Sequence, residues 1–226
     1  MSIRLHVVPS LCNGAPILKR RAVYYRGMGG FAVVDVTGFV LAGGKSTRMG
    51  TDKAFIEFEG RILLERALGL VRSVTPDIRI VGAREKFAPF APVVEDIFRE
   101  RGPLGGIHAA LRGSQTELNF MLAVDMPFVS ETFLQYLIGE ARTATEATVV
   151  VPRSEGRRQP LCAVYRPQFA DMAEQALLAG RNRIDSLFDA VETRVIEEDE
   201  LARAGFSSPI FRNLNTPEQL EKQRRA

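Results

Sequence analysis

Short runs of β-branched residues alternate with longer stretches of helical periodicity along most of this chain, and this alternation restricts its fold more than any other feature. The runs at 38–41, 78–81, 93–94, 120–124, 148–151 and 163–165 are predicted to be strands. Apolar residues recur at helical spacing in 62–73, 104–112, 131–142 and 169–178. Because strands that alternate with helices form a doubly wound, mostly parallel sheet, we predict an α/β fold.

The predicted elements also indicate where a ligand would bind. The strands are continuously apolar, as expected when helices cover both faces of the sheet. The stretch 131–142 has one apolar face, and Ser130 precedes it as a typical helix N-cap. Doubly wound sheets bind ligands at the carboxyl ends of their strands. The residues that follow each strand are therefore the candidates for a functional site.

Charge and composition exclude several classes of function. The formal net charge of +3 is carried by the leading residues, since 1–34 contain no acid and the rest of the chain has a net charge of −2. We therefore expect no nucleic-acid partner. No stretch approaches the roughly 18 apolar residues of a membrane span. The two cysteines, Cys12 and Cys162, form no metal-binding spacing, which favours a reducing, cytoplasmic compartment.

Residues 1–36 differ in character from the remainder. Pro9 and Pro16 interrupt their apolar stretch, and no secretory cleavage motif follows it. We predict that this segment is an extension, either disordered or produced by a start assigned too early, with Met28 as the alternative start. Residues 37–226 are then predicted to form a single domain.

The first predicted strand runs into a glycine-rich loop, residues 41–53, with the sequence L-A-G-G-K-S-T-R-M-G-T-D-K. Its glycines let the backbone approach a ligand, and Lys45, Arg48 and Lys53 supply cations that could neutralise a triphosphate. The spacing fits neither a Walker A loop, whose first glycine would fall on Phe39, nor the GxGxxG fingerprint. The alternative interpretation is a glycine-rich turn with solvated lysines.

Acidic residues follow two of the later strands. Asp96 comes shortly after 93–94, and Asp125 leaves 120–124 ahead of a proline. Mg²⁺ takes one or two carboxylates together with substrate phosphates and water, so a single aspartate can bind it. Either residue could instead cap a helix or stabilise a turn, and the cap is the more natural assignment for Asp96.

Basic and amide side chains mark the second half of the chain. Arg153, Arg157 and Arg158 could bind an anionic phosphate, or they could form a solvated basic hairpin. Farther along, Thr216 and Pro217 are typical of a helix N-terminus, and the asparagines at 213 and 215 precede them.

The loop pattern L-A-G-G-x-S-x-R-M-G-x-D-K-A resembles the signature of the molybdenum cofactor guanylyltransferase (MobA) family. D-x-P-[FY] at 125–128, G-P-L-x-G at 102–106, G-x-x-Q-P-L-x-A-x-Y at 156–165 and N-x-N-T-P at 213–217 resemble further motifs of that family, in its order. The resemblance covers about 38–224. It implies a three-layer, Rossmann-like sheet, the nucleotide-diphospho-sugar transferase fold, and makes 37–226 a nucleotidyltransferase domain.

The resemblance also implies roles for individual residues. Backbone groups would hold the nucleotide at Leu41, Ala42, Gly43 and Gly44. Arg48 and Lys53 would face its phosphates as catalytic residues. Asp125 would bind Mg²⁺, and Asp96 would contact the nucleotide. On the acceptor side, the family motifs point to Arg157, Gln159, Asn213 and Asn215. One departure is that Gly82 stands where some relatives have an asparagine that contacts the nucleotide.

The activity implied by the resemblance is transfer of GMP from GTP to molybdopterin, with release of pyrophosphate and Mg²⁺ as cofactor. Gly43 and the Asp52–Lys53 pair favour GTP over the CTP or ATP of related enzymes. Molybdoenzyme chaperones are further expected partners. The alternatives are a transferase of the same fold with another nucleotide or a sugar-phosphate acceptor, and an adaptor that binds GTP without turnover.

Overall fold

The computed structural model describes residues 5–6, 21–24, 31–43 and 52–214. Its central sheet has the strand order β11-β10-β12-β9-β4-β7-β8, and β13 pairs with β10. The strands of this sheet are β4 (Val36–Leu41), β7 (Asp77–Val81), β8 (Val93–Val94), β9 (Leu118–Ala123), β10 (Val149–Ser154), β11 (Arg157–Arg158), β12 (Cys162–Tyr165) and β13 (Thr193–Ile196). Every strand predicted from the sequence is present.

The sheet is mostly parallel around its centre. β4 lies between β7 and β9 and is parallel to both, and β8 continues parallel to β7. β12 runs antiparallel to β9 and to β10, which makes the sheet mixed. β13, which the sequence patterns did not predict, pairs parallel with β10.

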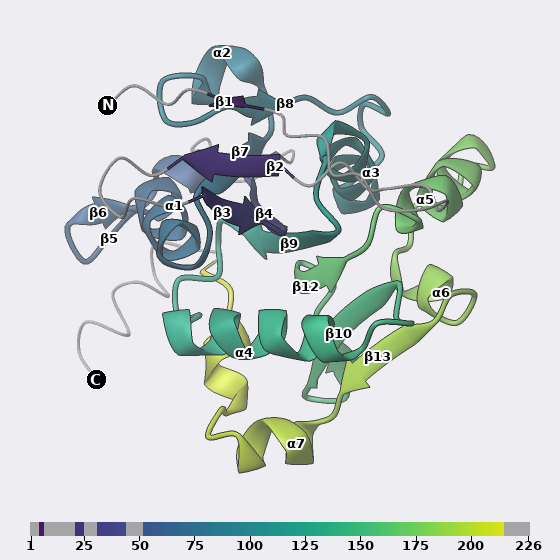
Figure 1. Cartoon of the computed structure of the whole chain (residues 1–226). Helices are drawn as coiled ribbons and strands as arrows, with labels where there is room; N and C mark the ends of the chain where they lie inside the picture. Colours follow the sequence, from purple (N-terminus) through teal and green to yellow (C-terminus); the bar gives the residue numbers. More distant parts are fainter. Residues whose placement is uncertain (1–4, 7–20, 25–30, 44–51, 215–226) are drawn as a thin grey trace.

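Helices cover both faces of the sheet, so the molecule has three layers (Figure 1). α1 (Leu63–Val74) and α4 (Glu131–Thr143) pack on one face, and α3 (Pro103–Gly113) and α5 (Phe169–Leu178) pack on the other. The predicted cap at α4 is confirmed, because the Ser130 hydroxyl accepts the Phe133 backbone N–H at 3.2 Å. The predicted α/β fold, with its doubly wound and mostly parallel sheet, is confirmed.

Shorter elements complete the described part of the chain. They are α2 (Arg84–Phe87), α6 (Asp185–Phe188), α7 (Glu198–Arg203), the 3-10 segments η2 (Lys53–Phe55) and η3 (Ser208–Phe211), and the hairpin β5 (Glu57–Phe58) with β6 (Arg61–Ile62). β1 (Leu5–His6), β2 (Arg21–Tyr24) and β3 (Phe31–Val34) form a separate antiparallel sheet. Among the described residues, no helix has the length and apolar character needed to span a membrane.

Gly38 allows α1 to pack closely on the central strand. A Cβ atom at this position would lie 2.2 Å from Val71 Cγ1 and 3.1 Å from Thr75 Cγ2, both of which belong to the α1 side of the sheet. Val71 is fully buried and β-branched, so its side chain has little freedom to move away. The spacing between α1 and β4 therefore depends on glycine at position 38.

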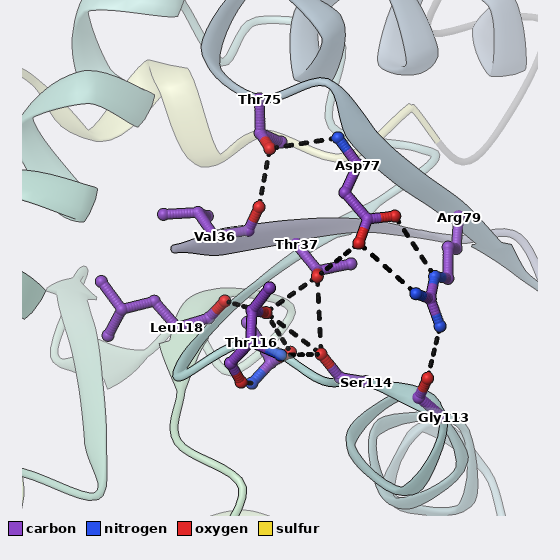
Figure 2. A network of polar contacts seen from close by, with 10 residues as sticks. Val36, Thr37, Thr75, Asp77, Arg79, Gly113, Ser114, Thr116 and Leu118 are labelled. Atoms are coloured by element: carbon purple, nitrogen blue, oxygen red, sulfur yellow. Dashed lines mark hydrogen bonds and ion pairs between the residues drawn. The ribbon is translucent and has the colours of Figure 1, made fainter. Parts of the chain in front are cut away.

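A buried polar network holds the amino ends of the central strands (Figure 2). The Thr37 hydroxyl donates to Asp77 Oδ2 at 3.1 Å and lies 2.8 Å from the Thr116 hydroxyl. The Thr75 hydroxyl donates to the Val36 carbonyl oxygen at 2.7 Å. Because a slip of one residue would turn Thr37 to the opposite face, this network fixes the register of β4.

Candidate functional site

A cavity of about 540 Å³ opens at the carboxyl ends of β4, β7 and β9. This is the edge at which doubly wound sheets bind ligands. The cavity is lined by Leu41, Ala42, Gly43, Asp52, Lys53, Val81, Asp96, Glu100, Gly102, Pro103, Gly106, Ala123, Val124, Asp125 and Leu161. It thus brings together the start of the glycine-rich loop, its closing lysine and both candidate aspartates.

Lys53 and Asp125 are in direct contact within this cavity. Lys53 Nζ donates to Asp125 Oδ2 at 3.0 Å, although the two residues are 72 positions apart. Asp125 is held by the sheet, because the preceding Val124 N–H donates to the Leu41 carbonyl oxygen at 3.1 Å. The side chains of the pair are 29% and 15% exposed, so both lie at the cavity wall rather than in open solvent. The arrangement places a cation and a carboxylate side by side at the strand ends.

The turn that carries Lys53 is stabilised by its neighbour. Asp52 precedes η2, and its Oδ1 accepts the Ala54 backbone N–H at 3.2 Å. This is the geometry of an N-cap, which satisfies a donor that the short helix leaves unpaired. Asp52 therefore stabilises the turn from which the Lys53 side chain extends.

The start of the glycine-rich loop is tied to β7. The N–H groups of Ala42 and Gly43 both donate to the Val81 carbonyl oxygen at 3.0 Å. Since both N–H groups are already hydrogen-bonded to Val81, Ala42 and Gly43 would contact a nucleotide through their carbonyl oxygens. Gly44 and Arg48 lie outside the described residues.

Asp96 is the most unusual carboxylate of the cavity. Its Oδ1 is buried and has no hydrogen-bond partner among the described residues. Burial raises the pKa of its carboxyl group above the usual range, because desolvation disfavours the charged form. Asp96 does not cap α3, whose N-cap is Gly102, so the helix-cap interpretation is wrong. An unsatisfied, buried acceptor at a cavity wall is suited to a ligand's N–H or O–H groups.

The packing of Phe87 explains why position 82 is a glycine. A Cβ atom there would lie 2.6 Å from the Phe87 ring, which is buried beneath the end of β7. An asparagine, as in some relatives, would displace that ring. In this chain the position therefore has no side chain with which to contact a nucleotide.

The predicted acceptor segment begins in the β10–β11 hairpin, and its Leu161 lines the cavity. Arg153 and Arg158 are bound by acids, with Arg153 Nε 2.9 Å from Glu197 and an Arg158 Nη2 atom 2.8 Å from Asp189. Arg157 is exposed and has no acidic partner in the described part of the chain. The three arginines are therefore not equivalent, and Arg157 is the one available to an anionic ligand.

Gln159 and Asn213 occupy different settings. The Gln159 amide donates to the carbonyl oxygens of Ser154 and Arg157, so it braces the hairpin from within. Asn213 is exposed and lies near Asp125, because the next residue, Leu214, donates its N–H to the Asp125 carbonyl oxygen at 2.9 Å. Asn215 lies outside the described residues.

Glu100 and Leu161 also line the cavity and were not identified from the sequence. Glu100 has a positive φ of 63°, which is strained for a residue with a side chain and is often found at functional sites. Leu161 reaches the cavity because its carbonyl oxygen accepts the Ala123 N–H at 2.8 Å. Neither has a sequence signal of its own, although Leu161 lies within the Q-P-L motif.

Comparisons with known proteins agree on one family. Residues 38–195 match the model of the MobA-like NTP transferase domain. The molybdenum cofactor guanylyltransferase of Desulfosudis oleivorans is 36% identical over 190 residues, which cover 83% of this chain and 93% of that protein.

Solved structures give the same result. Molybdopterin-guanine dinucleotide biosynthesis protein A from Archaeoglobus fulgidus superimposes with a TM-score of 0.71 at 28% identity, covering 82% of this chain and 95% of that one. The 4-diphosphocytidyl-2C-methyl-D-erythritol synthase of Anaerococcus prevotii has a TM-score of 0.62 at 16% identity, over 83% and 93% of the two chains. The second likeness concerns the fold alone.

Proposed function

The chain belongs to the family of MobA-like NTP transferases, and we propose that it transfers GMP from GTP to the terminal phosphate of molybdopterin. The observation that carries this proposal is the pairing of Lys53 with Asp125 in a cavity at the carboxyl ends of the central strands. Nucleotidyl transfer from a nucleoside triphosphate requires a cation that binds the phosphate oxygens and a carboxylate that binds a metal ion.

In the proposed reaction, an oxygen of the acceptor phosphate attacks the α-phosphorus of GTP. A new P–O bond forms, the bond between the α-phosphorus and the bridging oxygen breaks, and pyrophosphate leaves with the electron pair. The nucleophile is already an anion, so the protein needs no general base. Its contribution is to position the reactants and to offset the charge that develops on the phosphate oxygens, which Lys53 and the loop residue Arg48 would do.

Asp125 fits a divalent cation such as Mg²⁺. Its carboxylate lies at the cavity wall, where Oδ2 is bound to Lys53 at 3.0 Å and the side chain is 15% exposed. Mg²⁺ prefers oxygen ligands and commonly takes a single carboxylate together with nucleotide phosphates. When bound, the ion would neutralise the triphosphate and polarise the reacting phosphoryl group.

Asp96 is proposed to read the base. Its carboxylate oxygen without a partner can accept N–H groups, and guanine presents a ring N–H beside an amino group, whereas cytosine and adenine offer only an amino group on that edge. The carbonyl oxygens of Ala42 and Gly43 are acceptors of the same kind. These features favour GTP over CTP or ATP. The similarity of the chain to molybdenum cofactor guanylyltransferases also favours GTP.

The function is tested by incubating the chain with GTP and Mg²⁺, with and without molybdopterin, and measuring pyrophosphate. We expect release only with both substrates. Stronger release with CTP, with ATP or with a sugar phosphate as acceptor would identify the alternative transferase, and GTP binding without turnover would identify an adaptor. Cytoplasmic location, chaperone partners and the division of the chain into an extension (1–36) and a single domain (37–226) stay predictions.

Replacing Asp96 with asparagine is expected to weaken GTP binding by about 10- to 100-fold, because a charged acceptor is lost. In the wild-type protein, GTP binding should weaken as the pH falls, and at a higher pH than an ordinary aspartate would give, since burial raises the pKa of Asp96. The variant should lack this dependence. Calorimetric titration at several pH values measures both effects, and wild-type affinity in the variant would exclude this role.

The same substitution should make the fold more stable. A buried carboxyl group whose pKa is raised on folding costs stability once the pH rises above its unfolded-state pKa, so the charged form is unfavourable at neutral pH. Asparagine has no charge to desolvate. Thermal unfolding at pH 7 should therefore show a gain on the order of 1 kcal/mol.

Replacing Arg157 with alanine is expected to raise the KM for molybdopterin about tenfold without changing the KM for GTP, because one guanidinium–phosphate contact is lost. Arg158→Ala is the matched control, since the Arg158 guanidinium is already bound to Asp189 and lies 5.5 Å from the centre of the Phe188 ring. Steady-state kinetics with each substrate varied measures the effect. A larger rise in Arg158→Ala than in Arg157→Ala would contradict the assignment.

A further inference from the structure

The closing end of the glycine-rich loop carries a carboxylate that has two contacts. Asp52 lines the cavity next to Lys53, and its Oδ1 caps the turn by accepting the Ala54 N–H. Its other oxygen, Oδ2, accepts the ammonium group of Lys86 at 3.1 Å. Lys86 belongs to α2 and is 34 residues away in the sequence.

A carboxylate in this place presents an electrostatic problem. The proposed ligand is a triphosphate, and Asp52 is 26% exposed at the wall of the same cavity. Like charges so close together repel each other, and the repulsion is stronger near a protein surface than in bulk water. The cap on the Lys53 turn is therefore compatible with a triphosphate only if its charge is offset.

Lys86 is anchored so that it can offset this charge. The following residue, Phe87, is buried and stacks on Phe55 of η2, with ring centroids 5.9 Å apart and planes at 16°. On the other side, Arg84 Nε donates to Glu95 Oε2 at 3.2 Å. α2 is thus fastened both to the turn that follows the loop and to the end of β8, and Lys86 lies between these attachments.

We propose that Lys86 is a positioning residue of the nucleotide site. Its ammonium group neutralises Asp52, so that Asp52 can hold the Lys53 turn without repelling the bound triphosphate. This inference rests on the proposed function as far as nucleotide binding is concerned, and it does not depend on the acceptor. An exposed ion pair contributes little to stability, so the role predicts an effect on affinity rather than on folding.

The test is the equilibrium binding of Mg²⁺-GTP to the full chain in four variants: Lys86→Ala, Lys86→Arg, Asp52→Asn and the double variant Asp52→Asn with Lys86→Ala. We expect Lys86→Ala to weaken binding about fivefold at low salt and Lys86→Arg to restore it. Asparagine at 52 keeps the oxygen that accepts the Ala54 N–H but carries no charge. In that background, loss of the Lys86 ammonium should change affinity by less than about twofold.

Arg142→Ala is the control, because Arg142 is also exposed and paired with an acid, Asp35, at the other end of β4 from the cavity. Its GTP affinity should equal that of the wild type. Thermal unfolding of each variant shows that it is folded. An unchanged affinity in Lys86→Ala, or an equal loss with aspartate and with asparagine at 52, would overturn the role of Lys86 while leaving the proposed function intact. Failure of the wild-type chain to bind GTP would overturn both.

Discussion

Replacing Asp125 or Lys53 with alanine is expected to lower acceptor-dependent pyrophosphate release by about 1,000-fold. Asp125 is the proposed metal ligand, and Lys53 is the described cation that contacts it at 3.0 Å. Their effects should not add, because each residue positions the other and both act on the same triphosphate. A stopped assay with saturating GTP and molybdopterin measures pyrophosphate release by Asp125→Ala, by Lys53→Ala and by the double variant.

Loss of activity must be separated from loss of the fold. The Asp125 backbone carbonyl still accepts the Leu214 N–H in the alanine variant, so the local chain path is expected to persist. Asp199→Ala serves as a control, since this exposed residue pairs with Arg203 one turn away on α7. Its activity should match the wild type. Full activity in Asp125→Ala or in Lys53→Ala would refute the site assignment.

The second large effect concerns stability rather than activity. Gly38→Ala is expected to lower the free energy of unfolding by about 3 kcal/mol, because the added methyl group overpacks the contact between β4 and α1. That methyl group would lie 2.2 Å from Val71 Cγ1, so either the strand or the helix must move. Denaturant unfolding followed by circular dichroism measures the loss.

Two further variants make this test specific. Val71→Ala removes the atom that the new methyl group would meet, so the double variant should lose less stability than the two single losses predict together. Gly69→Ala, on the exposed side of the same helix, meets no atom within 4 Å and should stabilise by about 0.5–1 kcal/mol. If Gly38→Ala behaved like Gly69→Ala, the close packing of α1 on β4 would be wrong.

The elements of the fold were largely predictable because their signals are local. α5 has the predicted bounds, and α1, α3 and α4 differ from prediction by at most one residue at each end. β13 was missed because its partly exposed polar residues interrupt the apolar pattern. A strand at the sheet edge needs a partner more than it needs a hydrophobic sequence, and here β10 supplies that partner.

The site was predictable only in part. Glycines, cations and acids at strand ends indicated Lys53, Asp96 and Asp125, and these residues do share one cavity. Their partners could not be inferred in the same way. The hydrogen bond from the Gly43 N–H to the Val81 carbonyl oxygen depends on how separate segments meet in space. The contact of Lys86 with Asp52 depends on it as well.

The central position of β4 has a consequence for biosynthesis. This strand precedes both of its neighbours in the chain, and Thr37 reaches Thr116 across 79 residues. During synthesis, β4 therefore remains without one of its two neighbouring strands until β9 has left the ribosome. Contacts between residues so distant in sequence are also slow to form. Since Asp125 follows β9 directly, competence to bind a nucleotide would not arise before translation has passed the middle of the chain and the centre of the sheet can close.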